Sequence, residues 1–112
     1  MKKTVLIVED ERKICLLLQK LLSTDSNSVE CAFSLNEGIE KLSSVEPDVV
    51  LLDNNLPDGQ GVDYIKDFKN GVNRKVIMLS AMHNLRDKAI SQGVDCFLEK
   101  PVNIKTIRNL LR

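Results

Sequence analysis

Nearly uninterrupted apolar runs alternate along the chain with longer segments in which apolar residues recur every three or four positions. Five short runs predict β-strands, at residues 4–8, 29–33, 49–52, 75–79 and 96–98. The first, third and fourth runs lack the polar alternation of a half-exposed strand, which is typical of strands covered by helices on both faces. We therefore expect these three runs at the centre of a parallel sheet.

Helical periodicity follows each predicted strand. A first helix begins just after Asp10 and carries apolar residues at the i, i+3, i+4, i+7 and i+8 positions: Ile14, Leu17, Leu18, Leu21 and Leu22. Ser34 and Glu37 have capping-box spacing at the start of a second helix, which stops before Pro47. This pattern predicts amphipathic helices that cover the sheet.

The last three helices are shorter and are delimited by capping residues. The third runs from Gly61 to about residue 68, with Gly71 beyond its end. Asn84 caps a fourth helix that ends near Gly93, and Asn103 caps a fifth that runs towards the end of the chain. The elements therefore alternate as (βα)5.

This order predicts an α/β fold, a doubly wound five-stranded parallel sheet in one domain that covers residues 1–112. In such sheets, ligands bind beyond the carboxyl ends of the strands. The polar residues that follow the apolar runs all belong to that edge: Glu9, Asp10, Asp53, Ser80 and Lys100. We expect the functional site there.

Composition narrows the function classes. Hydrophobic residues make up 43% and charged residues 29% of the chain, which is typical of a globular domain. The 16 basic and 16 acidic residues balance, so no overall field draws the domain to nucleic acid or to an anionic membrane. We expect no direct nucleic acid contact. No uninterrupted apolar segment approaches the roughly 20 residues of a membrane span, so we also expect no membrane association and a cytoplasmic location.

Three cysteines, Cys15, Cys31 and Cys96, are odd in number, lie far apart and show no metal-ligand spacing. They are interpreted as reduced core cysteines of a cytosolic protein. The single histidine, His83, is interpreted as an exposed loop residue and not as a phosphodonor.

Three carboxylates at one sheet edge indicate a metal site. If the first and third strands are neighbours, then Glu9, Asp10 and Asp53 raise one another's pKa unless a cation intervenes. Mg²⁺ prefers such oxygen ligands. Two structural alternatives stay open: Asp10 as the N-cap of the first helix, and Glu9 as an exposed charge at a strand end.

Lys100 and Ser80 complete the predicted site. Lys100 would neutralise the acidic cluster and donate to a phosphoryl oxygen, or else form only a salt bridge. The Ser80 hydroxyl could donate to a second phosphoryl oxygen, although a serine at a strand end is commonly a turn former. Together with a carboxylate nucleophile, which needs no general base at neutral pH, these residues indicate phosphoryl chemistry.

In the order of these motifs, the whole chain resembles the receiver domains of two-component response regulators. The shared motifs are the pair Glu9-Asp10, Asp53 with Leu56-Pro57 and Gly61 after it, Ser80-Ala81, Phe97 and Lys100-Pro101. The resemblance implies a flavodoxin-like (CheY-like) fold with strand order 2-1-3-4-5. Gln60 departs from the pattern, because an aspartate often stands at this position.

The resemblance also implies the roles of the site residues. Asp53 would accept a phosphoryl group from a sensor histidine kinase, and Ser80 and Lys100 would hold the phosphoryl oxygens. Mg²⁺ would be bound by Asp10, Asp53 and the backbone carbonyl of Asn55, with Glu9 assisting. The protein would thus be a signalling switch and not an enzyme that acts on a separate substrate.

Ser80 and Phe97 match the switch positions of the family, where a hydroxyl moves towards the phosphoryl group and an aromatic ring turns inward. Phe97 has no hydroxyl to satisfy, so packing alone limits its inward state; a half-buried strand aromatic is the structural alternative. The fourth helix, fifth strand and fifth helix would form the face that contacts an output domain or downstream protein. A phosphorylation-dependent homodimer stays open.

Two other functions compete with this interpretation. One is a receiver-like interaction module without phosphotransfer. The other is a phosphatase of the haloacid dehalogenase type, which places a second acid two residues after its nucleophile, where this chain has Asn55.

Overall fold

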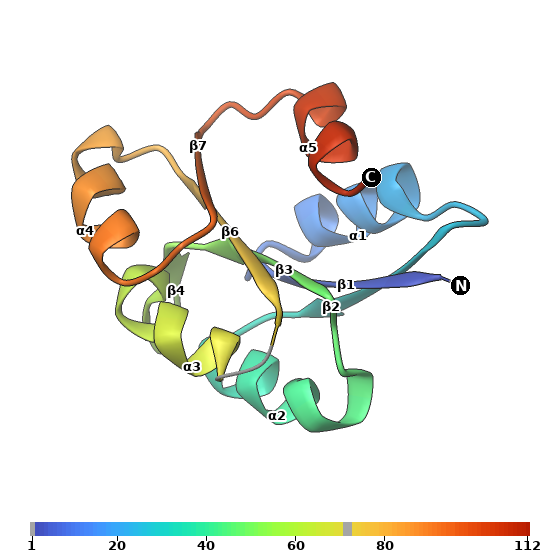
Figure 1. Cartoon of the computed structure of the whole chain (residues 1–112), viewed down its shortest axis with the longest axis horizontal. Helices are drawn as coiled ribbons and strands as arrows, with labels where there is room; N and C mark the ends of the chain where they lie inside the picture. Colours follow the sequence, from blue (N-terminus) through green and yellow to red (C-terminus); the bar gives the residue numbers. More distant parts are fainter. Residues whose placement is uncertain (1, 71–72) are drawn as a thin grey trace.

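A five-stranded parallel sheet with helices on both faces forms the centre of the computed structural model, which describes residues 2–70 and 73–112 (Figure 1). The strands are β1 (Lys3–Val8), β2 (Asn27–Ala32), β3 (Val49–Asp53), β6 (Lys75–Ser80) and β7 (Cys96–Glu99). Their order across the sheet is β2-β1-β3-β6-β7. This corresponds to 2-1-3-4-5 among the five strands of the sheet, so the predicted flavodoxin-like fold is confirmed.

Within the described residues, five α-helices and two 3₁₀ helices follow the strands in turn. They are α1 (Arg12–Leu22), α2 (Leu35–Val45), η1 (Gly61–Tyr64), α3 (Ile65–Lys69), η2 (His83–Leu85), α4 (Arg86–Ser91) and α5 (Ile104–Leu110). The predicted third helix is therefore a 3₁₀ turn followed by a short α-helix. Gly71, expected beyond its end, lies outside the described residues. A small antiparallel hairpin, β4 (Asn55–Leu56) with β5 (Gly59–Gln60), follows β3 and was not predicted.

Two apolar cores hold the helices to the sheet. Alternate residues of β1, β3 and β6 point to opposite faces because side chains alternate along a strand. One face, with Leu6, Leu52 and Met78, packs under α2, α3 and α4, while the other, with Ile7 and Leu51, packs under α1 and α5. The central strands are buried on both sides, which explains their continuous apolar sequence.

Two of the predicted caps are confirmed. Ser34 Oγ accepts a hydrogen bond from the backbone N–H of Glu37 at the start of α2, and Asn103 Oδ1 accepts one from Lys105 N–H at the start of α5. Asp58, in the turn of the β4–β5 hairpin, accepts further hydrogen bonds from Leu35 N–H and Asn36 N–H, each at 2.9 Å. The hairpin after β3 thus helps to fix the start of α2.

The alternative of Asp10 as an N-cap and the predicted cap at Asn84 are both wrong. The residue before α1 is Glu11, and no side chain caps this helix, so Asp10 is not its N-cap. Asn84 lies inside η2, and α4 begins after Leu85 without a side-chain cap. A 3₁₀ turn that leads directly into α4 supplies its N-terminal turn, which removes the need for a capping side chain.

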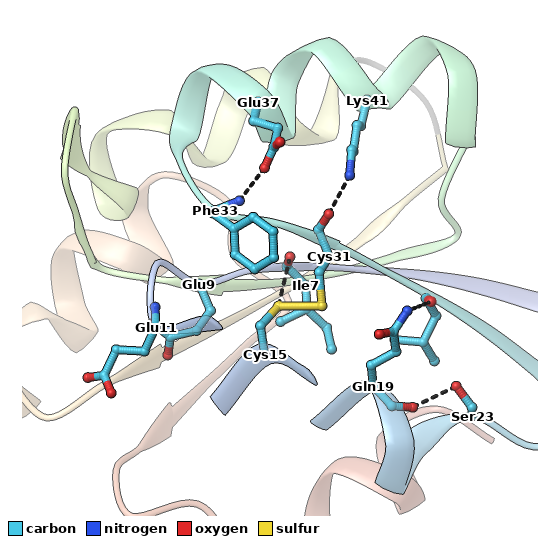
Figure 2. The surroundings of a disulfide bond; sticks show 11 residues. Ile7, Glu9, Glu11, Cys15, Gln19, Ser23, Cys31, Phe33, Glu37 and Lys41 are labelled. Carbon is cyan, nitrogen blue, oxygen red and sulfur yellow. Dashed lines mark hydrogen bonds between the residues drawn. A yellow bond between two sulfur atoms is a disulfide. The ribbon is translucent and has the colours of Figure 1, made fainter. Parts of the chain in front are cut away.

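The interpretation of all three cysteines as reduced is also wrong. Cys15 of α1 and Cys31 of β2 form a disulfide (Figure 2), and Cys96 is the free cysteine. Their Cα atoms are 6.3 Å apart, because α1 packs its inner face on the side of the sheet to which Cys31 points. The pairing needs the tertiary contact between α1 and β2, which residue spacing alone does not reveal.

No helix within the described residues is long and apolar enough to cross a membrane.

Candidate functional site

The carboxyl ends of β1, β3, β6 and β7 meet at one edge of the sheet, because the parallel register fixes their relative positions. Asp53 of β3 pairs with Leu79 of β6, and Ser80 of β6 pairs with Glu99 of β7. The backbone N–H of Lys100 donates to the Ser80 carbonyl oxygen at 2.9 Å. The residues that follow these strand ends therefore converge at the edge that the sequence predicted.

Three carboxylates gather at this edge. One oxygen each of Glu9, Asp10 and Asp53 lies within 4.8 Å of the others. Glu9 and Asp53 are buried, each with 5% exposure, while Asp10 is exposed. Glu9 is therefore not the exposed strand-end charge that the sequence left open. Hard oxygen donors at this spacing, open to solvent on one side, suit a Mg²⁺ ion that keeps several of its waters.

Lys100 neutralises part of this charge. Its Nζ atom lies 2.6 Å from Asp53 Oδ1 and 3.5 Å from Glu9 Oε1. The lysine side chain is one-third exposed, whereas both carboxylates are nearly buried. Lys100 thus reaches the cluster from the end of β7, with its ammonium group between two acids.

Burial governs the ionisation of the cluster. Burial raises the pKa of Asp53, and the hydrogen bond and charge of Lys100 offset only part of this increase. Burial and the neighbouring Asp53 charge also raise the pKa of Glu9. Burial alone would lower the pKa of Lys100, but Asp53 and Glu9 outweigh it and raise that pKa. The site is short of positive charge, as expected of a site that binds a cation.

The loop after Asp53 approaches the strand closely at Gly61. A Cβ atom at this position would collide with the Asp53 carbonyl oxygen, so only glycine fits. The Gly61 N–H donates to the Asn54 carbonyl oxygen at 2.9 Å, and the Val62 N–H donates to Asn54 Oδ1 at 3.1 Å. This network fixes the backbone that carries Asp53.

Ser80 and Asn55 occupy different surroundings. Ser80 is buried, and its Oγ accepts a hydrogen bond from the Met82 N–H at 3.0 Å. Asn55 is exposed at the start of β4 and pairs with Gln60 across the hairpin. The predicted metal contact of the Asn55 backbone carbonyl stays a prediction, and so does the hydrogen bond from Ser80 to a phosphoryl group.

Phe97 is buried, with 4% exposure, so the alternative of a half-buried strand aromatic is wrong. Its ring packs in the core under α2, α3 and α4. The Arg86 guanidinium carbon lies 5.4 Å from the centre of the Phe97 ring, and Arg86 Nη2 donates to the Phe97 carbonyl oxygen at 3.4 Å. Arg86, the first residue of α4, therefore ties this helix to β7 at the predicted switch position.

The sequence reasoning missed Arg86 and Asn54. Nothing in the local sequence marks Arg86, because its partner lies 11 residues away on another element. The sequence does single out Asn54, because it is a polar residue that directly follows the apolar run of β3 and Asp53. His83 is exposed, as expected, at the start of η2.

Helix α1 carries an apolar patch near the acidic cluster. Ile14, Leu17 and Leu21 are 36–55% exposed although they follow helical spacing on one side of α1. Between α1 and the segment that follows β7 lies a hollow of about 200 Å³, and its lining includes Glu9 and Lys100. Exposed apolar side chains grouped on one side of a helix beside a charged site are typical of a protein contact.

Comparisons with known proteins agree with this geometry. Residues 5–112 match the family described as the response regulator receiver domain. The chain is 38% identical over 110 residues to the KDP operon transcriptional regulatory protein KdpE of Escherichia coli (strain K12). That alignment covers 96% of this chain and 49% of KdpE, so the chain spans about half the length of this curated relative.

Solved structures share the fold over nearly the entire chain. A response regulator receiver domain protein (CheY-like) from Methanospirillum hungatei JF-1 superposes with a TM-score of 0.90 at 25% identity, covering 99% of this chain and 91% of that one. A CheY-like receiver domain from Methylobacillus flagellatus superposes with a TM-score of 0.88 at 26% identity, covering 99% and 97%.

Proposed function

The chain belongs to the response regulator receiver family of two-component signal transduction, and from this membership we propose that it is a phosphorylation-dependent switch with Asp53 as the phosphoryl acceptor. The observation that carries the proposal is the placement of the Asp53 carboxylate 2.6 Å from Lys100 Nζ and beside Glu9 and Asp10. A nucleophile, a cation and further carboxylates that can hold a metal are thus together at one sheet edge.

The proposed step is a phosphoryl transfer from a phosphohistidine of a sensor histidine kinase. An Asp53 carboxylate oxygen attacks phosphorus, the new O–P bond forms as the P–N bond breaks, and the histidine nitrogen keeps the bonding electron pair. The Lys100 ammonium stabilises negative charge on the phosphoryl oxygens as the group transfers. The domain takes part only in its own phosphorylation and dephosphorylation, so it is not an enzyme for a separate substrate.

Mg²⁺ is the metal that this donor set fits best, because Asp10 and Asp53 offer hard carboxylate oxygens and Glu9 lies close to both. The Asn55 backbone carbonyl is proposed as a further ligand. When bound, the ion would neutralise charge on the phosphoryl group and hold it in line with the acceptor. Lys100 supplies the rest of the positive charge.

Partners follow from the same proposal. The kinase would approach the acidic cluster along the apolar patch of Ile14, Leu17 and Leu21 on α1. The face formed by α4, β7 and α5 would contact an output domain or downstream protein and would change with phosphorylation through Ser80 and Phe97. We place the protein in the cytoplasm, where it would make no nucleic acid contact through this domain.

Acetyl phosphate tests the acceptor directly. With Mg²⁺, it should add a single phosphoryl group of about 80 Da to the protein, which hydroxylamine removes because an acyl phosphate reacts with nitrogen nucleophiles. Asp53→Ala should abolish the mass shift, while Asp58→Ala, which removes an exposed carboxylate of the β4–β5 hairpin, should retain it. A folded wild-type protein that shows no mass shift would instead support an interaction module without phosphotransfer.

A further inference from the structure

Asn54 carries the one buried side-chain donor that has no hydrogen-bond partner among the described residues. The residue is 1% exposed, and its Nδ2 atom is the unpaired group. Buried polar groups are nearly always paired, because leaving one unpaired is unfavourable. An unpaired amide next to the proposed phosphoryl acceptor therefore calls for a partner that this conformation does not supply.

The orientation of the Asn54 amide is fixed by its other end. Val62 N–H donates to Oδ1 at 3.1 Å, and only the oxygen of the amide can accept this hydrogen. A flipped amide would place two donors against each other and is excluded on that ground. Nδ2 is therefore the end that points away from Val62.

Asn54 directly follows the end of β3, and Ser80 is the last residue of the neighbouring strand β6. Because Asp53 pairs with Leu79, the residues that follow them, Asn54 and Ser80, are near each other at this edge of the sheet. Asn54 Oδ1 accepts from the N–H of Val62, which packs in the core with Leu52 and Met78, and alternation from Met78 places Ser80 on the same face of the sheet. Two buried polar residues thus lie on the same face, at the ends of neighbouring strands.

The Ser80 hydroxyl makes a single hydrogen bond among the described residues in this conformation. Its Oγ accepts a hydrogen bond from Met82 N–H, and its own proton has no acceptor among the hydrogen bonds of the described residues. Met82 is 43% exposed, so water can satisfy its N–H once the serine oxygen leaves. Ser80 can therefore exchange its hydrogen-bond partner at little cost, and the Asn54 amide has no partner for its Nδ2 atom among the described residues.

We propose that Asn54 positions Ser80 in the phosphorylated state. In that state the Ser80 Oγ leaves Met82 N–H and donates its proton to a phosphoryl oxygen, and Asn54 Nδ2 donates to the Ser80 Oγ in place of Met82. The Asn54 amide and the Ser80 hydroxyl proton then both find acceptors in one rearrangement. The inference rests on the proposed phosphorylation of Asp53 and assigns a role to a residue outside the acceptor, metal and lysine positions.

The arrangement would bias the switch. The unphosphorylated conformation contains an unpaired buried amide, and the phosphorylated conformation does not, so Asn54 would favour the latter. Asn54 acts through Ser80 and touches no reacting atom, which makes it a positioning residue. A buried water on Nδ2 is the competing explanation, and it predicts no dependence on the state of Asp53.

The side-chain amide signals of Asn54 provide the first test. Nuclear magnetic resonance spectra of ¹⁵N-labelled protein are recorded with Mg²⁺, before and after addition of beryllofluoride, which mimics a phosphoryl group on a carboxylate. The Asn54 side-chain proton signals should move downfield, and Ser80→Ala should abolish the movement. The signals of exposed Asn109 on α5 serve as the reference.

A double-mutant cycle provides the second test. Asn54→Leu should weaken beryllofluoride affinity roughly fivefold in the wild type and less than twofold in Ser80→Ala, since one hydrogen bond is at stake and the cycle isolates it. Asn54→Asp retains an oxygen for Val62 N–H and is the second variant; its added charge acts in both backgrounds and cancels in the cycle.

The outcomes separate the inference from its premise. Equal losses in both backgrounds, or unmoved Asn54 signals in protein that has bound beryllofluoride, would overturn the role of Asn54 and leave phosphorylation of Asp53 intact. Wild-type protein that binds no beryllofluoride and gains no mass from acetyl phosphate would overturn both. A movement of the Asn54 signals that depends on Ser80 would establish the positioning role.

Discussion

Lys100 Nζ lies 2.6 Å from Asp53 Oδ1, although 47 residues separate the two along the chain. The pair joins the end of β3 to the end of β7 across the intervening β6. Lys100 also lies 3.5 Å from Glu9 Oε1, so one ammonium group serves two nearly buried carboxylates. Burial, which Lys100 offsets only in part, raises the pKa of both acids, and this gives the first prediction.

Removing the Asp53 charge should stabilise the fold at neutral pH. Burial raises the pKa of Asp53 in the native state, so the native state holds this proton to higher pH than the unfolded chain does. Stability therefore falls as the pH rises from about 4 towards neutrality. Asp53→Asn should therefore increase the free energy of unfolding at pH 7, and the increase should shrink as the pH falls to about 4. Urea unfolding in EDTA measures the difference.

Asp58→Asn is the control, because the pKa of Asp58 is shifted in the opposite direction to that of Asp53. Hydrogen bonds from Asn36 N–H and Leu35 N–H lower the pKa of Asp58 in the folded protein. The ionised carboxylate therefore stabilises the fold at a pH above its pKa in the unfolded chain. This stabilisation is lost as the pH falls through its pKa in the folded protein. Asp58→Asn should therefore be less stable than wild type at pH 7, with a difference that shrinks in acid. The same pH trend for both variants would contradict the assignment.

Lys100 should couple phosphorylation to the output face. Lys100→Ala removes a phosphoryl ligand and leaves the carboxylates, so Mg²⁺ affinity should change little, while phosphorylation by acetyl phosphate should slow roughly 10–100-fold. Phosphorylated Lys100→Ala should also fail to change the resonances of Phe97. Mass spectrometry and aromatic nuclear magnetic resonance measure the two effects. Wild-type-like changes at Phe97 in this variant would refute the coupling.

Arg86 should hold Phe97 in its buried position. Arg86→Met removes the guanidinium over the ring and the hydrogen bond to the Phe97 carbonyl, and an exposed interaction of this kind contributes about 0.5–1 kcal/mol. The variant should lose that much stability and show broadened Phe97 ring signals. Lys88→Met, which breaks an exposed ion pair of the same helix with Asp63, is the control. Equal effects in both variants would remove the special role of Arg86.

The apolar patch on α1 should affect the phosphorylation rate only when the phosphodonor is a protein. Leu17→Ser should reduce phosphotransfer from the cognate histidine kinase roughly tenfold, since an exposed anchor is lost from the contact. The rate with acetyl phosphate should not change. Leu16→Ser is the matched control, because Leu16 is similarly exposed (53% against 55%) and lies outside the Ile14, Leu17 and Leu21 patch. A reduced rate with acetyl phosphate would place the defect in the site and not in docking.

The disulfide between Cys15 and Cys31 should stabilise the domain. It closes a loop between residues 16 apart, which corresponds to about 3 kcal/mol of unfolding free energy. Cys31→Ala should lose stability of this order, while Cys96→Ala should keep the cross-link. Alkylation under denaturing but non-reducing conditions should label only one cysteine of the wild type. Three labelled cysteines would show that Cys15 and Cys31 are thiols.

The sequence determined the sheet and its functional edge because these follow from local patterns. Continuous apolar runs mark buried parallel strands, and the residue after each run lies at the carboxyl edge whatever the detailed packing. The sequence alone is therefore enough to select the site candidates Glu9, Asp10, Asp53, Ser80 and Lys100. The Ser34 and Asn103 caps were also readable, since a cap and its helix adjoin in the chain.

Only the tertiary structure decided the contacts between elements far apart in the chain. Cys15 meets Cys31 because α1 packs against β2, and Arg86 reaches Phe97 because α4 begins beside β7. The burial of Glu9 and the unpaired amide of Asn54 likewise depend on what surrounds them in space. Residue order supplies the chemical groups at the edge of the sheet, whereas packing sets their desolvation, their charge partners and their unpaired donors.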